Sequence, residues 1–413
     1  MTAAGGIESR PPGEFSRGAI LVMFACAAGM SAGPTPMVSA VATLFMKPLA
    51  AEFGLSRGGV SLILLILPLA VGLFSPVGGW LIDRLGVRRA LLPAVIMLAA
   101  CYASMWWVTA LWQYVALAFV VAASVSVHCY SSYTKVIALY FSRHRGLVTG
   151  LVIACGSGLG AALMPQLVEP LIVRHGWRFA YAGMSAIILL WAVPILFFFL
   201  REPKVRSSAV ASGPSLPLQG DTAAEAMRSG VFWMLASAIY VTPLAIVGTV
   251  AHLFPMLTEK GLSTDQAATA LSFIYVGGMV GQLSAGYLLD RVHSPKVALN
   301  YVCGALCGLT LLHTAHSAVL LSLGAFAVGL GQGSEMSILA YLSSRYFGLL
   351  HYGVIYGRLY GVANLGIASG VLLMGYAHDL TGAYDEVGIA MIGVLGLAAV
   401  LFARLPRYRF TRT

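Results

Sequence analysis

The sequence predicts an all-α membrane protein in which twelve transmembrane helices form two six-helix bundles related by pseudo-symmetry. Of the 413 residues, 59% are hydrophobic and only 10% are charged, and the mean hydropathy is +0.85. The apolar residues come in runs of about twenty or more, the length that a helix needs to cross a hydrocarbon layer about 30 Å thick. A water-soluble protein of this size has no core large enough to bury so much apolar surface.

A repeat at a displacement of 207 positions divides the chain into two homologous halves. The segment 79–84 returns as 286–291 with its Gly, Asp and Arg retained. The same displacement pairs residues over more than a hundred positions without a gap, among them Pro36 with Pro243, Glu52 with Glu259, and His144 with His351. Long repeats built of apolar helices are typical of transporters.

The positive charges predict the orientation of the chain. The net charge is +10, but the basic residues punctuate the apolar runs instead of forming a patch, which argues against nucleic acid as a partner. If both termini are cytoplasmic, 18 of the 25 Lys and Arg residues fall on that side, as the positive-inside rule requires. We therefore expect a multi-pass protein of a bacterial inner membrane with both termini in the cytoplasm.

The apolar runs give the expected elements in order. The expected segments are a cytoplasmic tail (1–17), a first bundle (18–200), a cytoplasmic linker (201–229), a second bundle (230–404) and a cytoplasmic C-terminal tail (405–413). The spans are expected near residues 20–45, 60–82, 90–110, 112–141, 146–171, 179–200, 231–257, 267–289, 297–314, 319–347, 353–377 and 387–403. Each half thus contributes six.

Two stretches inside the spans carry further information. The first span is interrupted by Gly33-Pro34-Thr35-Pro36, and broken backbone at membrane depth needs protein or water beside it, so this span is expected to line a cavity. The run 156–160 has three glycines but no strand before it, so we expect close helix packing and not a nucleotide loop. The six cysteines form no CxxC pair and are expected to be small buried hydrophobes, with no disulfide, metal site or cofactor.

The turn after the second span carries the most specific motif of the chain. Its residues are Gly79, Asp83, Arg84, Gly86, Arg88 and Arg89. With six plus six helices, this motif resembles that of the major facilitator superfamily, over nearly the whole chain. The resemblance implies a cytoplasmic gate in which Asp83 approaches a neighbouring helix end while the bases bind acids. Asp290 and Arg291 imply a second, weaker gate. The alternative for Arg84, Arg88 and Arg89 is that these bases only enforce the membrane topology.

Three further stretches resemble the monocarboxylate transporter and oxalate:formate antiporter branch of that family. They are residues 47–57, 140–151 and 378–384. Many members of the branch hold the substrate carboxylate with an arginine in the eighth helix. Gln282 stands at that position here, with Gly278 in place of the accompanying acid, and we expect Gln282 to contact the substrate in the arginine's stead.

Ionisable residues inside the spans are costly and are therefore candidates for function. Glu335 is the repeat mate of His128, and the pseudo-twofold axis predicts that both face one central cavity. Because both side chains can carry a proton, Glu335 is predicted to couple transport to protons, with His128 as its partner or as a substrate contact. The alternatives are a structural hydrogen bond for Glu335 and a packed, neutral His128.

Two cations also fall inside the spans. Lys135 lies seven residues beyond His128, a spacing that predicts the same helical face, and it is the expected contact for an anionic substrate. The alternative is that Lys135 snorkels or pairs with a backbone carbonyl. Arg358 lies opposite a stripe of Tyr356, Tyr360 and Asn364, so it is expected either to contact the substrate or to anchor the cytoplasmic gate.

The stripe of Tyr356, Tyr360 and Asn364 is expected to line the cavity. Other tyrosines inside spans offer hydroxyls and ring faces to a substrate, with core packing as the alternative: Tyr130, Tyr133, Tyr275 and Tyr341.

The predicted function is secondary transport of an organic anion, either a monocarboxylate or an aromatic carboxylate, together with protons. The transporter is expected to act as a monomer in a lipid bilayer, by alternating access about a site at mid-membrane. One alternative is proton-driven efflux of an amphipathic drug-like compound, and another is a membrane receptor that binds without transporting. An enzyme is not expected, because the sequence shows no nucleophile with its base and no phosphate loop.

Overall fold

The computed structural model describes residues 15–55, 57–141, 143–202 and 220–410. Within these ranges the chain is almost entirely helical, and twelve helices are long and apolar enough to cross a membrane. The predicted all-α fold with twelve membrane spans is therefore confirmed.

The first half builds its six spans from helices that are often broken. In chain order they are α1 (Arg17–Ser31), η1 (Thr35–Ser39) and α2 (Ala42–Phe53); α3 (Arg57–Leu85); α4 (Val87–Ser104) and η2 (Met105–Trp107); α5 (Leu111–Val127) and α6 (Tyr130–Tyr140); α7 (Arg145–Val152), η3 (Ile153–Gly158) and α8 (Leu159–His175); and α9 (Trp177–Ile187), η4 (Ile188–Ala192) and α10 (Val193–Phe199).

The second half is more regular. A short helix, α11 (Ala223–Arg228), lies in the expected linker and precedes the spans. The spans follow as α12 (Gly230–Ala251) with its extension α13 (Leu253–Glu259), α14 (Thr264–Arg291), α15 (Lys296–Thr314), α16 (Ala318–Phe347), α17 (Tyr352–Thr381) and α18 (Asp385–Ala403).

The predicted interruption of the first span is confirmed. Pro34 and Pro36 lack the N–H group that an α-helix needs, and the chain passes from α1 into the short π-helix η1. The N–H of Ala40 donates to the carbonyl of Thr35 at 2.8 Å, a wide turn that re-forms the hydrogen bonding before α2 begins.

The fourth span is also broken, which was not predicted. His128 ends α5, and Cys129 is extended (φ −115°, ψ 179°) before α6 begins. The Ser132 hydroxyl donates to the Val127 carbonyl at 2.5 Å and so satisfies one acceptor at the break. Because α5 and α6 are not one helix, the seven-residue spacing does not place Lys135 on the face of His128, and that expectation was wrong.

Small residues let the helices of the first half approach closely. A Cβ atom added to Gly160 would lie 3.0 Å from the Cα of Ser31, and one added to Gly156 would lie 3.0 Å from the Cα of Ala27. The predicted packing role of this glycine run is confirmed. The expected burial of the cysteines holds for three of them, whereas Cys155, Cys303 and Cys307 are exposed.

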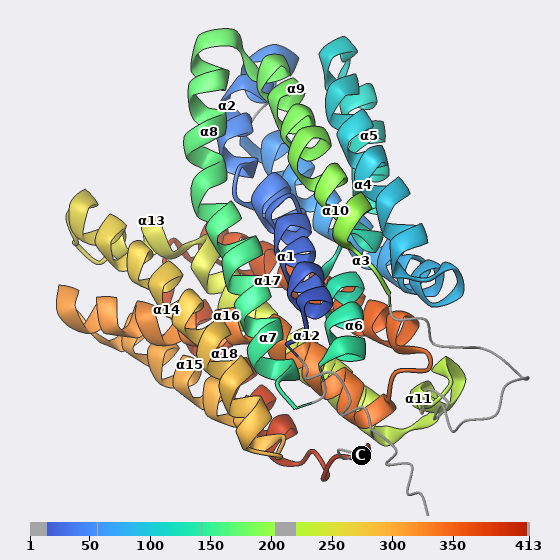
Figure 1. Cartoon of the computed structure of the whole chain (residues 1–413). Coiled ribbons are helices and arrows are strands. Elements are labelled where there is room, and N and C mark those ends of the chain that lie inside the picture. Colours follow the sequence, from blue (N-terminus) through green and yellow to red (C-terminus); the bar gives the residue numbers. More distant parts are fainter. Residues whose placement is uncertain (1–14, 56, 142, 203–219, 411–413) are drawn as a thin grey trace, which may run out of the picture.

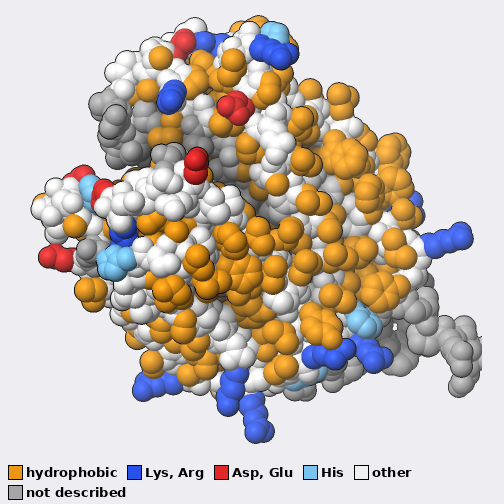
Figure 2. Space-filling view, turned by 90° about the vertical axis from the view of Figure 1, so that its left-hand side faces the viewer, with side chains coloured by type: hydrophobic (Ala, Val, Ile, Leu, Met, Phe, Trp, Pro, Cys, Tyr) orange, Lys and Arg blue, Asp and Glu red, His pale blue; other side chains and the backbone are white. Residues whose placement is uncertain are grey.

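The two halves meet at one end of the molecule and diverge towards the other. Figure 1 shows them diverging towards the α8 end of the first half and the α13 end of the second. We name the end where they meet, formed by the α3–α4 turn, the α6–α7 connection, α11 and the C-terminal tail, the basic end. There α3 packs on α17, and α7 packs on α14. Hydrophobic side chains cover the visible outer surface as a broad belt, with Lys and Arg gathered at its borders (Figure 2).

Candidate functional site

A cavity of about 710 Å³ lies between the middle of the bundle and the end opposite the basic end. The first half lines it from η1, α2, α3, α4, η2, α5 and α9. The second half lines it from α17 and from His252 at the end of α12. Pro34 and Met37, from the break of the first span, form part of its wall. The expectation that this broken span lines a cavity is therefore confirmed.

Three tyrosines that the sequence analysis did not single out form one wall of the cavity. Tyr102, Tyr114 and Tyr181 come from three different spans. The hydroxyl groups of Tyr114 and Tyr181 lie 2.9 Å apart, and that of Tyr102 donates to the Met37 carbonyl at 2.7 Å. Phe45 stacks on Tyr181 with ring centroids 4.2 Å apart. The signal in the sequence was three hydroxyl-bearing rings inside apolar spans, where each hydroxyl needs a partner.

The opposite wall contains most of the predicted stripe on α17. Tyr360 and Asn364 line the cavity, and the Asn364 amide donates to the Tyr360 carbonyl at 2.8 Å. Tyr356 lies one turn closer to the basic end, fully buried and stacked on Tyr360 at 6.1 Å. The stripe thus divides into two residues in the cavity wall and one beneath its floor.

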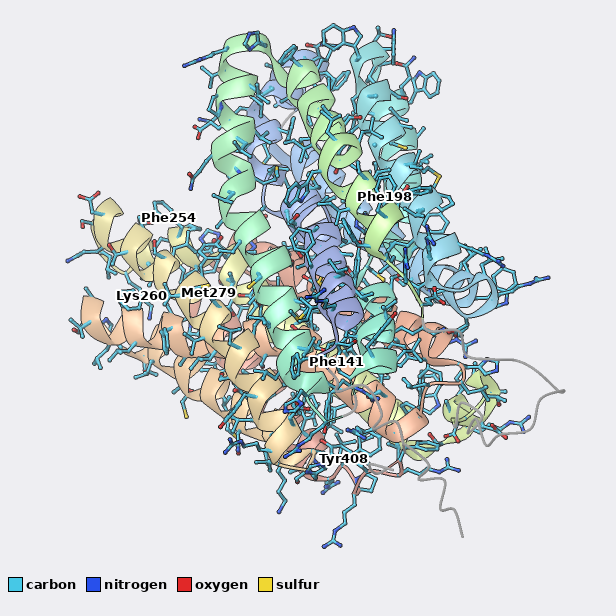
Figure 3. All side chains as sticks on the ribbon, in the orientation of Figure 1. Phe141, Phe198, Phe254, Lys260, Met279 and Tyr408 are labelled. Carbon is cyan, nitrogen blue, oxygen red and sulfur yellow. The ribbon has the colours of Figure 1, made fainter. Side chains whose placement is uncertain are left out.

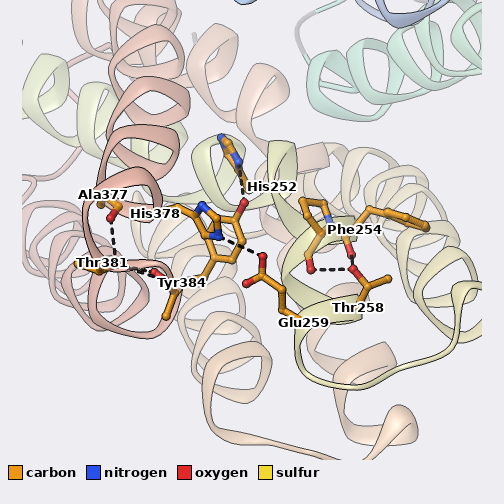
Figure 4. A network of polar contacts seen from close by, with 10 residues as sticks. His252, Phe254, Thr258, Glu259, Ala377, His378, Thr381 and Tyr384 are labelled. Atoms are coloured by element: carbon orange, nitrogen blue, oxygen red, sulfur yellow. Dashed lines mark hydrogen bonds and ion pairs between the residues drawn. The ribbon is translucent and has the colours of Figure 1, made fainter. Parts of the chain in front are cut away.

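A network of polar contacts connects α12, α13, α17 and Tyr384 (Figure 4), and His252 of this network lines the cavity. The His378 Nε2 lies 3.0 Å from a carboxylate oxygen of Glu259, and its ring stacks on Tyr384 at 4.3 Å. His252 lies 3.2 Å through Nε2 from the Val371 carbonyl and 3.3 Å through Nδ1 from the Tyr384 hydroxyl. These two contacts suit a neutral ring that donates from Nε2 and accepts at Nδ1.

Acidification is expected to weaken this network through His252. Burial lowers the pKa of His252, and the bond to the Val371 carbonyl offsets this only in part. The folded state therefore binds this proton less readily than the unfolded chain does, so stability is lost as the pH falls below about 6.5, the ordinary pKa of histidine. Between pH 7.5 and 5.5, the melting temperature of the wild type should fall further than that of His252→Gln.

The control for this pH experiment is His316→Gln, because His316 is exposed. It should follow the wild type at both pH values. His378, Glu259 and Asp379 also lie in this network and are present in both proteins. Equal pH sensitivity of the wild type and His252→Gln would therefore contradict the assignment of the effect to His252.

The predicted cations do not reach this cavity. Among the described residues that line it, none is Lys or Arg. Arg358 lies against α11, where its guanidinium donates to the Ala223 carbonyl at 3.3 Å and contacts the Met227 sulfur. Gln282 is half-buried on α14, where it faces Gly150 and Gly158 of the first half.

Lys135 instead contacts Asp83 at the basic end. Its Nζ lies 2.5 Å from the Asp83 Oδ1, and both side chains are about nine-tenths buried. The same carboxylate accepts the backbone N–H groups of Gly353 at 2.9 Å and Val354 at 2.8 Å, at the start of α17. A negative charge at a helix N-terminus is stabilised by the orphan N–H groups and by the helix dipole. Asp83 therefore ties α3 of the first half to α17 of the second.

The repeat produces the same contact a second time. Asp290 accepts the N–H groups of Gly146 at 2.8 Å and Leu147 at 2.7 Å, at the start of α7. We call the contacts of Asp83 and Asp290 with these helix ends the basic-end closure. The bond lengths give no sign that the second contact is the weaker one.

The other residues of the motif support this turn. Gly79 packs against the backbone of Gly353, where a side chain would collide, and Gly86 has a positive φ of 83°. The bases make local contacts. The Arg84 guanidinium lies over the Trp80 ring, and that of Arg291 lies over the Tyr287 ring. The Arg88 backbone N–H donates to Glu202 at 2.6 Å, and Arg89 is exposed.

The His128 and Glu335 side chains are both buried, but the cavity lining includes neither. His128 faces α1, with Nε2 3.1 Å from the Gly29 carbonyl and its ring 5.8 Å from that of Tyr133. The Glu335 Oε1 has no hydrogen-bond partner among the described residues. Glu335 lies within electrostatic range of Tyr360, which is a residue of the cavity wall.

The remaining tyrosines fall into different places. Tyr133 packs on Gly29, and Tyr130 lies at the cavity floor with its ring 6.4 Å from that of Tyr360. Tyr275 is 70% exposed and does not line the cavity, so neither the substrate contact nor the core packing expected for it is found.

Comparison with known proteins gives a consistent family match. The family model described as Major Facilitator Superfamily matches residues 19–357. The chain is 27% identical to a 3-(3-hydroxy-phenyl)propionate transporter of Escherichia coli, over 80% of this chain and 81% of that protein. It is 27% identical to the bovine monocarboxylate transporter 13, over 81% and 77% of the two chains. Its fold matches a crystal structure of the E. coli fucose:proton symporter with a TM-score of 0.71 at 15% identity, over 95% and 100% of the two chains.

Proposed function

The chain belongs to the Major Facilitator Superfamily, and from this membership we propose that it transports an aromatic carboxylate together with protons. A transporter of this family is a multi-pass membrane protein and not an enzyme. We propose that the basic end lies in the cytoplasm, because its excess of Lys and Arg fits the positive-inside rule. The proposal includes a bacterial inner membrane as its location and a monomer as the functional unit.

The observation that carries this proposal is the tyrosine-lined cavity that is closed at the basic end. Tyr102, Tyr114, Tyr181 and Tyr360 supply ring faces and hydroxyls from both halves. Such rings stack on an aromatic cargo, and their hydroxyls bind its polar substituents. A relative with 27% identity is named for an aromatic carboxylate, 3-(3-hydroxyphenyl)propionate, which supports the same class of cargo.

Alternating access follows from the two contact regions between the halves. The basic-end closure holds the cytoplasmic side shut while the cavity is accessible from the other side. When the Asp83 and Asp290 contacts release, the halves rock about the cavity and the cytoplasmic side opens. Lys135 acts in this step as the cation that neutralises Asp83.

Proton coupling is assigned to Glu335. Charging a buried carboxyl that lacks a hydrogen-bond partner is costly, so the group is suited to hold a proton while water is excluded. Its position near Tyr360 lets occupancy of the cavity and protonation influence each other. His128 contacts the Gly29 carbonyl of α1 and so stabilises the break between α5 and α6.

One observation favours a second function, the efflux of an amphipathic drug-like compound. The described cavity lining is mostly apolar and carries no Lys or Arg to hold a carboxylate. A cargo without a negative charge would leave no buried anion unpaired there.

Uptake into proteoliposomes distinguishes the two functions. With a proton gradient directed inward, labelled benzoate should accumulate saturably, and unlabelled aromatic acids should compete with it. Benzamide, which keeps the ring and lacks the charge, is the matched control and should not compete with benzoate for uptake. Transport of benzamide or of a lipophilic dye in place of benzoate would favour efflux of amphiphiles.

A further inference from the structure

Two arginines from opposite halves lie near each other in the closed part of the interface. Arg145 begins α7, and Arg345 lies in the last turn of α16. The two guanidinium groups interact electrostatically. Arg145 donates to the Ala138 carbonyl and to the Ser344 hydroxyl, each at 3.1 Å. Arg345 is 6% exposed, and its Nε and Nη2 have no hydrogen-bond partner among the described residues.

The neighbouring hydroxyl groups are unsatisfied as well. Tyr341 carries the Arg345 guanidinium 5.0 Å above its ring. The Tyr341 hydroxyl and the Ser337 hydroxyl are buried and lack partners among the described residues. Both residues line a small cavity of about 10 Å³ together with Arg145 and Ser344. A buried guanidinium without a countercharge is costly, and a cluster of donors around two cations is suited to bind an anion.

The acid near Arg145 is already engaged. Asp290 interacts electrostatically with Arg145, but its two oxygens accept the backbone N–H groups of Gly146 and Leu147. The described lining of the small cavity contains no carboxylate. Within the part of the chain that the structure describes, no acid is therefore hydrogen-bonded to the positive charge of Arg345.

A ladder of aromatic rings connects the large cavity to this cluster. Tyr360 lines the large cavity, Tyr356 stacks on it at 6.1 Å, and Tyr352 follows at 5.6 Å. Tyr352 lines the small cavity beside Arg145. An aromatic ring that moves along these tyrosines towards the basic end would bring its carboxylate to the two arginines.

The C-terminal tail covers the cluster from the basic end. The Phe410 N–H donates to the Arg345 carbonyl at 2.9 Å, and Tyr408 packs on Tyr341 with ring centroids 6.0 Å apart. Figure 3 places Tyr408 at the bottom of the molecule, below Phe141. The cluster is thereby separated from bulk water as long as the basic end is closed.

We propose that Arg145 and Arg345, with the hydroxyls of Tyr341 and Ser337, form a carboxylate subsite on the release side of the transport path. The proposal rests on the proposed function and extends it. A cavity of about 10 Å³ holds about one water molecule, so the subsite is occupied by the cargo only after the basic end has opened. It supplies the cations that are missing from the large cavity.

The test compares the two faces of the membrane. Membrane vesicles of both orientations, containing the full chain, are assayed with labelled benzoate. For Arg345→Gln, the KM for benzoate presented at the basic end should rise about tenfold, as expected for the loss of charge-assisted hydrogen bonds. The KM at the opposite face should change by less than about twofold. Arg345→Lys should restore part of the loss, and Arg404→Gln, an exposed arginine at the same end, is the matched control.

Equal changes at both faces, or no change at either, would overturn the subsite. If the wild type does not transport benzoate at all, it is the proposed function that fails, and a binding assay then decides on the subsite. In purified Asp83→Asn protein, whose basic end is expected to open, sodium benzoate should raise the melting temperature. The added Arg345→Gln change should abolish that shift, and an unchanged shift would contradict the proposal.

Discussion

Asp83→Asn is expected to open the basic end and to reduce the initial rate of uptake more than tenfold. The substitution removes the charge that Lys135 contacts at 2.5 Å and that caps α17 through Gly353 and Val354. Breaking a buried ion pair from one side costs about 3–5 kcal/mol, because the remaining charge stays buried and unpaired. A loss of this size shifts a two-state equilibrium more than about a hundredfold.

The opening can be measured directly at a residue of the closed interface. Ala340 lines the small cavity and is buried. In a background with the six native cysteines replaced by alanine, Ala340→Cys should react with a membrane-impermeant maleimide faster when Asp83→Asn is added. Asp265→Asn, an exposed aspartate in the first turn of α14, is the control and should leave the reaction unchanged.

The partner of Asp83 provides a further check. Adding Lys135→Met to Asp83→Asn removes the unpaired charge, so the double variant should regain much of the stability that the single variant lost. If the two substitutions act additively instead, Lys135 does not belong to the closure.

Glu335→Gln is expected to abolish accumulation driven by the proton gradient while leaving exchange of cargo intact. The amide keeps the shape of the buried side chain but cannot take up or release a proton. Uptake under an inward gradient should fall more than about tenfold, whereas exchange of labelled for unlabelled benzoate, which needs no net proton movement, should stay within about twofold of the wild type.

Glu169→Gln is the matched control, because Glu169 is an exposed carboxylate on α8. It should preserve both activities. Gradient-driven uptake that is unchanged in Glu335→Gln would remove this residue from the coupling step and leave it the structural role that its burial also allows.

Much of the architecture was predictable, because it depends on features that are local in sequence. Apolar runs set the spans, and the break at Pro34 and Pro36 follows from the missing N–H groups. The displacement between the repeats pairs Asp83 with Asp290 and Gly146 with Gly353, and both pairs make the same contact in the structure. A symmetric sequence thus produced a symmetric closure.

The parts that were not predicted depend on distances between helices. Residues 127–130 contain no Pro or Gly that would indicate a break in the helix. The helical face of Lys135 was therefore predicted as if the helix continued through these residues. The cavity tyrosines come from spans far apart in sequence. The sequence around a buried tyrosine looks the same whether the ring lines a cavity or packs in a core. Only packing decides which rings face the same space.

The central claim is that a cavity lined by tyrosines holds an aromatic carboxylate and is exposed to each side of the membrane in turn. Counterflow in proteoliposomes tests it most directly, because it requires binding and reorientation but no driving force. Vesicles loaded with unlabelled benzoate should transiently accumulate labelled benzoate above its external concentration. Absence of this overshoot, with folded protein in the vesicles and an overshoot for a neutral amphiphile instead, would contradict the claim.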